Sequence, residues 1–303
     1  MLVSEPPIVG PHSPPPLARA QADEGTAARI SQSQAFALHS RPDADRVIFL
    51  DFDGHTISGT AWNEGRADPI TVGSFSQEAA GSENESFSEA ELASIHEIWK
   101  RVSEDFAPWD VDVTTEYPGE AALHRTSLGD EQYGSHVVIT HDSGWFGPSG
   151  GVAYIGAFGM AYYSQAFVFS NHLAQGAAHS VAEAATHEVG HQLGLLHDGT
   201  TGGTAYYDGH DDWAPIMGVG YTRQVTQWSK GEYSHADNKE DDLAAIDRFL
   251  PGRAARSGPI TLPGGDSTTE AVIETGGGAD TYLVEVGGPT DITLSQVRPG
   301  GNL

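Results

Sequence analysis

The residues with the clearest chemistry are His187, Glu188 and His191, which follow one another in the order His-Glu-x-x-His. Four residues of an α-helix turn through about 400°, so the two histidines lie one turn apart on nearly the same side. Glu188 is rotated from His187 by about 100°, which places its carboxylate beside a shared ion without making it a ligand. Gly194 favours the end of the helix, after which the chain can return with His197 as a third ligand. The segment therefore predicts a site for one metal ion.

Three imidazole ligands indicate zinc and a hydrolytic reaction. Neutral imidazoles bind zinc at about 2.0–2.1 Å and leave one tetrahedral position open to water, whose pKa the metal lowers toward about 7. We expect Glu188 to take the proton of that water as general base and to pass it to the leaving amine. Zinc would also polarise the carbonyl group under attack. The alternative is an ordinary helix that carries two solvated histidines and a glycine cap.

The sequence predicts three helices. Ser88 and Glu91 form a capping box, and apolar residues then recur at steps of three and four, which predicts an amphipathic helix over residues 89–106. The Ala-rich segment Gly176–Leu195 is a helix by propensity and contains the histidine motif. Asn238 predicts the start of a last helix, which ends before Pro251 and Gly252.

Short apolar runs predict a sheet ahead of the histidine motif. Residues 54–86, rich in Gly, Ser and Asn, are predicted to be a long loop. The predicted strands cover residues 46–51, 111–115, 136–140, 152–157 and 167–170.

Composition divides the chain into three parts. Residues 1–44 are proline-rich and are predicted to be a leader or propeptide-like segment, largely disordered. Residues 45–252 contain all the helices and strands described above and form the predicted catalytic domain. Residues 258–303 show no helical period and predict a partial β-rich module, with strands separated by glycine clusters.

The charge balance limits the choice of partners. Lys and Arg number 15 against 42 Asp and Glu, a net charge of −27, which repels phosphate backbones and makes nucleic acid a poor partner. The alternative is that the acidity only keeps the protein soluble. The chain has no cysteine, which excludes disulfides, thiolate zinc ligands and cysteine nucleophiles. No apolar run reaches the roughly 18 residues of a membrane span. We expect a monomer by default.

The histidine motif, with Gly194 and His197 in place and Met217 20 residues further on, resembles that of metzincin zinc endopeptidases, HExxHxxGxxH followed by a methionine-bearing turn. The resemblance implies an α+β fold: a mixed twisted sheet, an active-site helix and a C-terminal helical subdomain. It implies that His187, His191 and His197 ligate zinc, that Glu188 is the base, and that Met217 lies beneath the histidines without ligating. It also implies protein or peptide substrates.

Two further residues are assigned from this resemblance. Asp198, directly after the third histidine, matches the reprolysin-type variant and is expected to support the site from behind its ligands. Some metzincins carry a tyrosine two residues past the methionine, which can ligate zinc or stabilise the transition state. Position 219 is Val, so Tyr221 is the nearest candidate for this role, and the alternative is that Tyr221 only packs in the core. Tyr206 and Tyr207 either line a cleft or pack in the protein interior, and both alternatives stay open.

The resemblance also extends beyond the zinc motif. The segments Asp105–Val113, Gly150–Gly159 and Gln227–Tyr233 also look like segments of secreted bacterial members of the group. This resemblance predicts an extracellular location, although no signal peptide is visible in the sequence. The segment after residue 255 resembles the start of a bacterial pre-peptidase C-terminal domain. Substrate is expected to pair with a sheet edge near the zinc, and Gly151–Gly159 is the candidate edge because its small residues permit close approach.

Three alternatives remain. Val47–Gly54 ends in Asp51 and Asp53 and is similar to the start of haloacid-dehalogenase-like phosphatases, in which the first Asp is the nucleophile. The same two carboxylates are candidates for a structural calcium site. A third alternative is a non-catalytic surface adhesin on a protease-like fold, against which the intact Glu188 argues.

Overall fold

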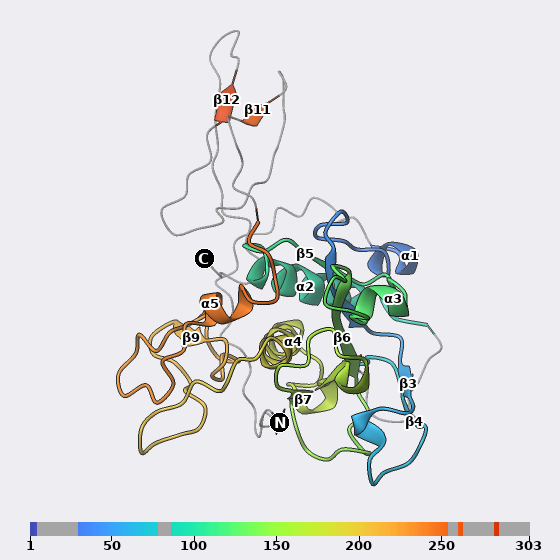
Figure 1. Cartoon of the computed structure of the whole chain (residues 1–303), viewed down its shortest axis with the longest axis horizontal. Coiled ribbons are helices and arrows are strands. Elements are labelled where there is room, and N and C mark those ends of the chain that lie inside the picture. Colours follow the sequence, from blue (N-terminus) through green and yellow to red (C-terminus); the bar gives the residue numbers. More distant parts are fainter. Residues whose placement is uncertain (5–29, 78–85, 254–259, 263–281, 285–303) are drawn as a thin grey trace.

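The computed structural model of the chain describes residues 1–4, 30–77, 86–253, 260–262 and 282–284 (Figure 1). Its centre is a six-stranded sheet in which β2, β5, β6 and β8 run parallel, β7 pairs antiparallel with β8, and β1 pairs antiparallel with β7. In sheet order the strands are β1 (Leu2–Ser4), β7 (Gly151–Tyr154), β8 (Gln165–Phe169), β6 (Tyr133–Thr140), β2 (Arg46–Asp51) and β5 (Val111–Thr114). Each of the five strand predictions therefore falls on a strand of this sheet.

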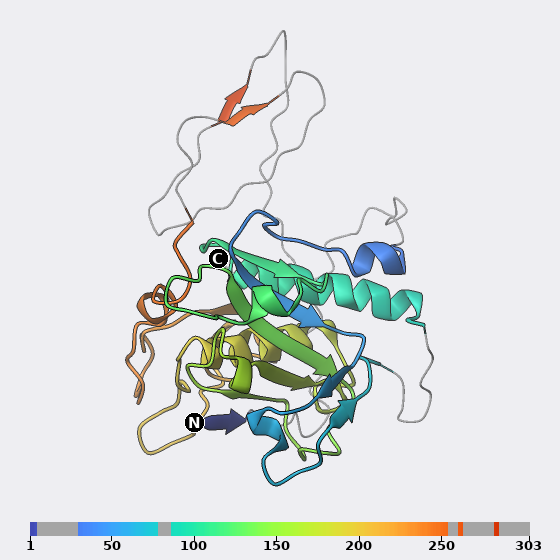
Figure 2. The same ribbon diagram turned by 45° about the vertical axis from the view of Figure 1, so that its right-hand side comes forward.

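The two long helices α2 (Glu89–Asp105) and α4 (Ala178–Gln192) lie against one another and pack on one side of the sheet (Figure 2). The main hydrophobic core fills the space between them and the strands, with Leu50 and Val137 from the sheet and Val189 from α4. This mixed α/β arrangement of a sheet with two main helices agrees with the predicted metzincin-like catalytic domain.

Helix α2 begins and ends as its sequence predicts. The Ser88 side chain accepts a hydrogen bond from the Glu91 backbone N–H, and the Glu91 carboxylate accepts one at 2.9 Å from the Ser88 N–H. This reciprocal capping satisfies two of the N–H groups that a helix start leaves without partners. The helix ends at Asp105, ahead of the capping residue Phe106.

Helix α4 ends in the turn that the third histidine needs. Gly194 adopts a left-handed conformation with φ of +100°, and Leu195 N–H donates to the Gly190 carbonyl group at 3.0 Å. A glycine takes this conformation at little cost, which reverses the chain directly after the helix. The prediction that Gly194 ends the helix is confirmed.

The opposite face of the sheet is covered by short elements. They are the hairpin of β3 (His55–Ile57) and β4 (Ile70–Val72), the 3-10 helices η1 (Ala61–Asn63) and η2 (Ala161–Tyr163), and the helix α3 (Glu120–Leu123). The sequence analysis predicted a loop over 54–86, which is wrong for the hairpin. Strands of three residues are too short for alternation of apolar and polar residues to identify them.

The last part of the predicted catalytic domain, for which the resemblance implies a helical subdomain, carries short elements only. After η3 (Ser170–His172) and α4 come the parallel pair β9 (Trp213–Pro215) and β10 (Val225–Gln227), then α5 (Asp242–Ile246). The predicted start of α5 at Asn238 is wrong: Asp241 caps the helix by accepting from Ala244 N–H at 3.1 Å. Asn238 instead accepts from Glu240 N–H, a local turn that competes with helix initiation.

Within the predicted leader the structure describes residues 1–4, which include β1, and residues 30–44. Helix α1 (Gln32–Ala35) has a capping box, and the carbonyl group of its buried Ala35 accepts a hydrogen bond from Thr115. Residues 5–29 of the leader lie outside the described residues. In the C-terminal module the structure describes β11 (Ile260–Leu262) and β12 (Tyr282–Val284), which pair in parallel, and the other predicted strands there lie outside it. None of the described helices is long and apolar enough to cross a membrane.

Candidate functional site

The three motif histidines meet at one point. His187 and His191 lie one turn apart on α4, and His197 returns to them beyond the Gly194 turn. The Nε2 atom of His191 lies 3.1 Å from Nε2 of His187 and 2.9 Å from Nε2 of His197. The prediction that these three residues converge is confirmed.

Hydrogen bonds set which nitrogen atoms of the triad carry protons. His187 Nδ1 and His191 Nδ1 lie 2.9 Å from the carbonyl oxygen atoms of Ile216 and Leu195, respectively. A carbonyl oxygen only accepts, so both Nδ1 atoms are the protonated donors and the lone pairs of neutral rings are on Nε2. Burial lowers the pKa of His191 to about 3 and of His197 to about 4. Burial and then the nearby His191 also lower the pKa of His187 far below its ordinary value.

This arrangement fits a zinc ion. The Nε2 lone pairs of His187 and His191 lie 3.1 Å apart and repel one another unless a cation lies between them. Nitrogen ligands at about 2.0–2.1 Å in a tetrahedron are separated by about 3.3 Å, so small ring movements are enough to accommodate the metal. The three histidines therefore form a metal-binding triad.

Glu188 is fully buried beside the triad, and strand β7 approaches it closely. A Cβ atom at Gly151, the first residue of β7, would lie 2.5 Å from Oε1 of Glu188. Residue 151 must therefore be glycine for this carboxylate and the strand to occupy their positions together.

Met217 is buried against the middle of the motif. A Cβ atom at Gly190 would lie 2.5 Å from its sulfur atom, so the methionine packs directly on the helix between the two ligands. Asp198 N–H donates to the Met217 carbonyl group at 2.8 Å, while the preceding residue, Ile216, accepts from His187. The turn thus braces the helix and the returning chain.

The other two predicted helpers lie behind or beside this centre. The Asp198 carboxyl group is buried with Ser229, and burial followed by the charge of Glu240 raises its pKa to about 7. The group thus belongs to the packing of the following loop. Tyr221 is buried in the main hydrophobic core.

Tyr206 is an aromatic residue of the site that the sequence analysis left open. Its ring centroid lies 4.2 Å from that of His197 and 6.3 Å from that of His187. Its hydroxyl group donates to the backbone carbonyl group of Ser4, at the end of β1. No spacing rule relative to the motif identifies Tyr206; the loop that brings it back is irregular.

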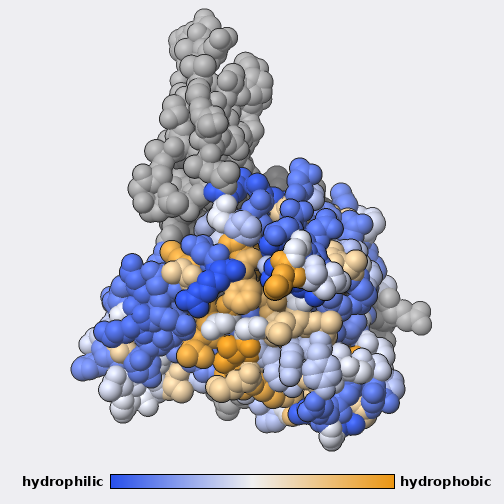
Figure 3. Space-filling model, viewed as in Figure 1, coloured by the Kyte–Doolittle hydropathy of each residue, from blue (hydrophilic) through white to orange (hydrophobic). Residues whose placement is uncertain are grey.

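The predicted substrate edge is occupied by the chain's own first residues. Strand β7 covers the first part of Gly151–Gly159, and β1 lies antiparallel along it with Val3 opposite Ala153. Ile155 N–H donates to the Met1 carbonyl group at 2.9 Å. An extended segment therefore pairs with this edge beside the triad. Figure 3 shows apolar residues gathered in the middle of the face on which Figure 1 shows α4 and β7.

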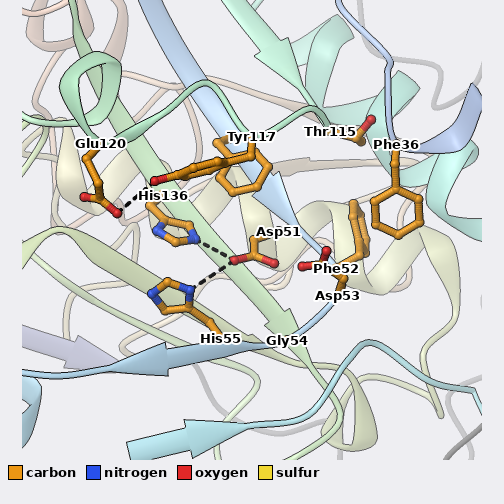
Figure 4. A pocket seen from close by; sticks show the side chains of 11 residues that line it. Phe36, Asp51, Phe52, Asp53, Gly54, His55, Thr115, Tyr117, Glu120 and His136 are labelled. Carbon is orange, nitrogen blue, oxygen red and sulfur yellow. Dashed lines mark hydrogen bonds and ion pairs between the residues drawn. The ribbon is translucent and has the colours of Figure 1, made fainter. Parts of the chain in front are cut away.

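Asp51 and Asp53, the basis of the phosphatase alternative, lie in a pocket of about 400 Å³ (Figure 4). His55 and His136 share this pocket, and neither Lys nor Arg is among its lining residues. A dianionic phosphate ester is held by positive charge, and the side chains that line this pocket include no permanent cation of their own. Burial lowers the pKa of His136 to about 4, so its imidazole is neutral as well.

Comparison with known proteins identifies one family. Residues 82–198 match the family described as metallo-peptidase family M12B, reprolysin-like, and the match ends directly after the third histidine of the triad. No curated protein matches the chain.

The triad geometry makes a prediction for metal affinity. His191 lies between the other two ligands, so we expect His191→Ala to weaken the tightest zinc site by a factor of at least about 100. Competition with a chromogenic chelator measures this affinity. His210→Ala, an exposed histidine outside the triad, is the control and should leave it unchanged. Equal affinity of His191→Ala and the unmodified chain would contradict the assignment.

Proposed function

Because the chain carries a reprolysin-like domain of metallopeptidase family M12B, we propose that it is a zinc-dependent endopeptidase. The observation that carries the proposal is the convergence of three neutral imidazole nitrogen atoms beside a buried carboxylate. Zinc, when bound by His187, His191 and His197, lowers the pKa of a water molecule and polarises the peptide carbonyl group.

Glu188 moves the proton in this proposal. Its carboxylate takes the proton of the attacking water and then donates it to the nitrogen atom of the departing peptide. The residue follows His187 on α4, so the helix fixes its place relative to the ligands, and Gly151 limits its movement on the side of β7. A rigid base of this kind loses little entropy when the reaction occurs.

We infer that the substrate backbone takes the place of β1 along β7. The antiparallel pairing of Val3 with Ala153 supports this mode of contact, in which backbone groups pair and alternate side chains face the protein. Such binding makes few demands on the substrate's sequence. While β1 is paired, a substrate cannot use the same edge, so β1 must leave before turnover.

Tyr206 is placed to hold a substrate carbonyl group. It already donates to the Ser4 carbonyl group of the paired segment, and its ring lies against His197. A substrate in the same position would present a carbonyl oxygen to this hydroxyl group. A donor directed at that oxygen stabilises negative charge that develops during attack.

We also propose that the protein is secreted from a bacterial cell. The resemblance to secreted bacterial members of the group and the strongly acidic composition, with a net charge of −27, support this proposal. Detection of the protein in the culture medium of its source organism, with a cytoplasmic enzyme retained in the cells, is the test.

Glu188→Gln separates a peptidase from a binding protein. We expect this variant to keep its zinc and to lose about 10²–10⁴-fold in the rate of casein hydrolysis, because the amide cannot accept the proton. Glu183→Gln is the matched control: it is a buried glutamate of the same helix that bonds the Thr226 hydroxyl group, and it should keep most activity. If Glu188→Gln digests casein at the unmodified rate, Glu188 is not the base.

Val3→Pro tests whether β1 blocks the substrate edge. Proline has no N–H group and is poorly tolerated in a paired strand, so we expect β1 to detach and kcat/KM for a short peptide to rise about tenfold. Leu2→Ala preserves the backbone and should change kcat/KM by less than about twofold. An unchanged kcat/KM in Val3→Pro would mean that β1 does not limit access.

Tyr206→Phe tests the carbonyl donor. Loss of one hydrogen bond of about 1–1.5 kcal/mol should lower kcat/KM by about tenfold without changing zinc affinity. Tyr207→Phe is the matched control, because the Tyr207 hydroxyl group lies by His210 and its ring stacks on Tyr233. Equal kcat/KM values for both variants would remove Tyr206 from the mechanism.

A further inference from the structure

A second group of metal-ligand side chains lies on the other side of the central sheet. In the pairing of β2 with β6, Phe49 is opposite His136, so Asp51, two residues further along β2, points to the same face as His136. The neighbouring residues Leu50 and Val137 point to the main core, which lies between the sheet and α4. The sheet therefore separates this group from the triad on α4.

Three donor atoms of this group converge on one another. Asp51 Oδ2 lies 2.7 Å from Nε2 of His136 and 3.5 Å from Nδ1 of His55, which β3 supplies (Figure 4). The set of one carboxylate oxygen and two imidazole nitrogen atoms lies within 4.8 Å. Ligands of a tetrahedral zinc ion at about 2.0–2.1 Å are about 3.3 Å apart, which these atoms can reach by small side-chain movements.

The charge of the pocket is unbalanced without a cation. Asp51, Asp53 and Glu120 all line it, together with the two histidines, and its lining contains neither Lys nor Arg. Asp51 itself is only 4% exposed. Its second oxygen, Oδ1, has no partner of good hydrogen-bond geometry in the described part of the chain, and only the backbone N–H and the carboxyl group of Asp53 approach the Asp51 carboxylate besides the two histidines. Buried carboxylates without a positive partner are costly.

The donor types select the class of cation. Calcium and magnesium take oxygen ligands almost exclusively, whereas imidazole nitrogen suits zinc and other divalent first-row transition metals. The predicted structural calcium at Asp51 and Asp53 took no account of His55 and His136, which are the nearest donor groups. The pocket is open and His55 is partly exposed, so an ion has a path of entry.

We propose that Asp51, His55 and His136 form a second binding site, for a divalent transition-metal cation, with the Asp53 carboxyl group at its margin. The ion would tie the hairpin of β3 and β4 to strands β2 and β6 of the sheet. The site is independent of peptide hydrolysis, since its residues approach the sheet from the face opposite the triad.

Zinc stoichiometry tests this site. Every variant in this experiment also carries Glu188→Gln, which prevents self-digestion. Each chain is dialysed against a zinc-buffered solution, and the number of zinc ions per chain is then measured by atomic emission. We expect two zinc ions in this background and one after adding His55→Ala. His124→Ala is the matched control, because its side chain is 23% exposed against 24% for His55 and it lies outside the donor set; it should retain two ions.

Variants of the triad distinguish this proposal from the proposed peptidase. Adding His191→Ala should leave one zinc ion, bound by the second site alone, and adding Asp51→Asn to that chain should leave none. A single ion in the Glu188→Gln background that disappears with His191→Ala overturns the second site and leaves the peptidase proposal intact. The second site is also overturned if the chain still binds two zinc ions after His55→Ala and after Asp51→Asn.

A spectroscopic measurement guards against loss of metal through misfolding. Cobalt(II) bound by the His191→Ala chain should give visible absorption bands from nitrogen and oxygen ligands, and these bands should be absent from the chain that also carries Asp51→Asn. Asparagine has nearly the size of aspartate and can still accept the His136 hydrogen bond, so the circular dichroism of the two chains should coincide. Identical cobalt spectra from both chains would overturn the assignment of Asp51.

Discussion

The candidate catalytic site depends on imidazole lone pairs that are directed at a single point by backbone hydrogen bonds. The carbonyl groups of Ile216 and Leu195 hold the Nδ1–H groups of His187 and His191, which leaves both Nε2 atoms facing inward. These carbonyl groups belong to the turn before Met217 and to the chain beyond Gly194. The metal-binding geometry is therefore a property of three chain segments rather than of the helix alone, and burial keeps the rings neutral so that they remain ligands.

The same packing explains why the Glu188 carboxylate and the edge of the sheet at β7 are adjacent. Glu188 is rotated from His187 by about 100° around the helix and meets β7 at Gly151, where a side chain would collide with it. The strand that lies against Glu188 is also the strand that β1 pairs with. An extended segment on this strand thus passes close to the triad, and Tyr206 contacts both that segment and His197.

The parts of the fold and the site that sequence predicts are those set by local geometry. His187, His191 and the Gly194 turn lie within eight residues, and helical rotation alone places them. Contacts between distant segments were not predictable: β1 pairs with β7 some 150 residues away, and Asp51 meets His136 across 85 residues through strand register. The capping of α5 by Asp241 rather than Asn238 was missed because both are good cap residues, and only the turn at Glu240 decides between them.

The two clusters differ in the charge of their ligands, and this difference separates their expected chemistry. A metal held by three neutral imidazoles keeps its full positive charge, so it can polarise a carbonyl group or a water molecule strongly. A cation held by Asp51 with Asp53 nearby would have much of its charge neutralised by carboxylates, which suits binding and cross-linking better than polarisation of a substrate. The central sheet keeps them apart because the side chains of a strand alternate between its faces. One sheet thereby supports a strongly polarising centre beside α4 and a charge-compensated one beneath the β3–β4 hairpin.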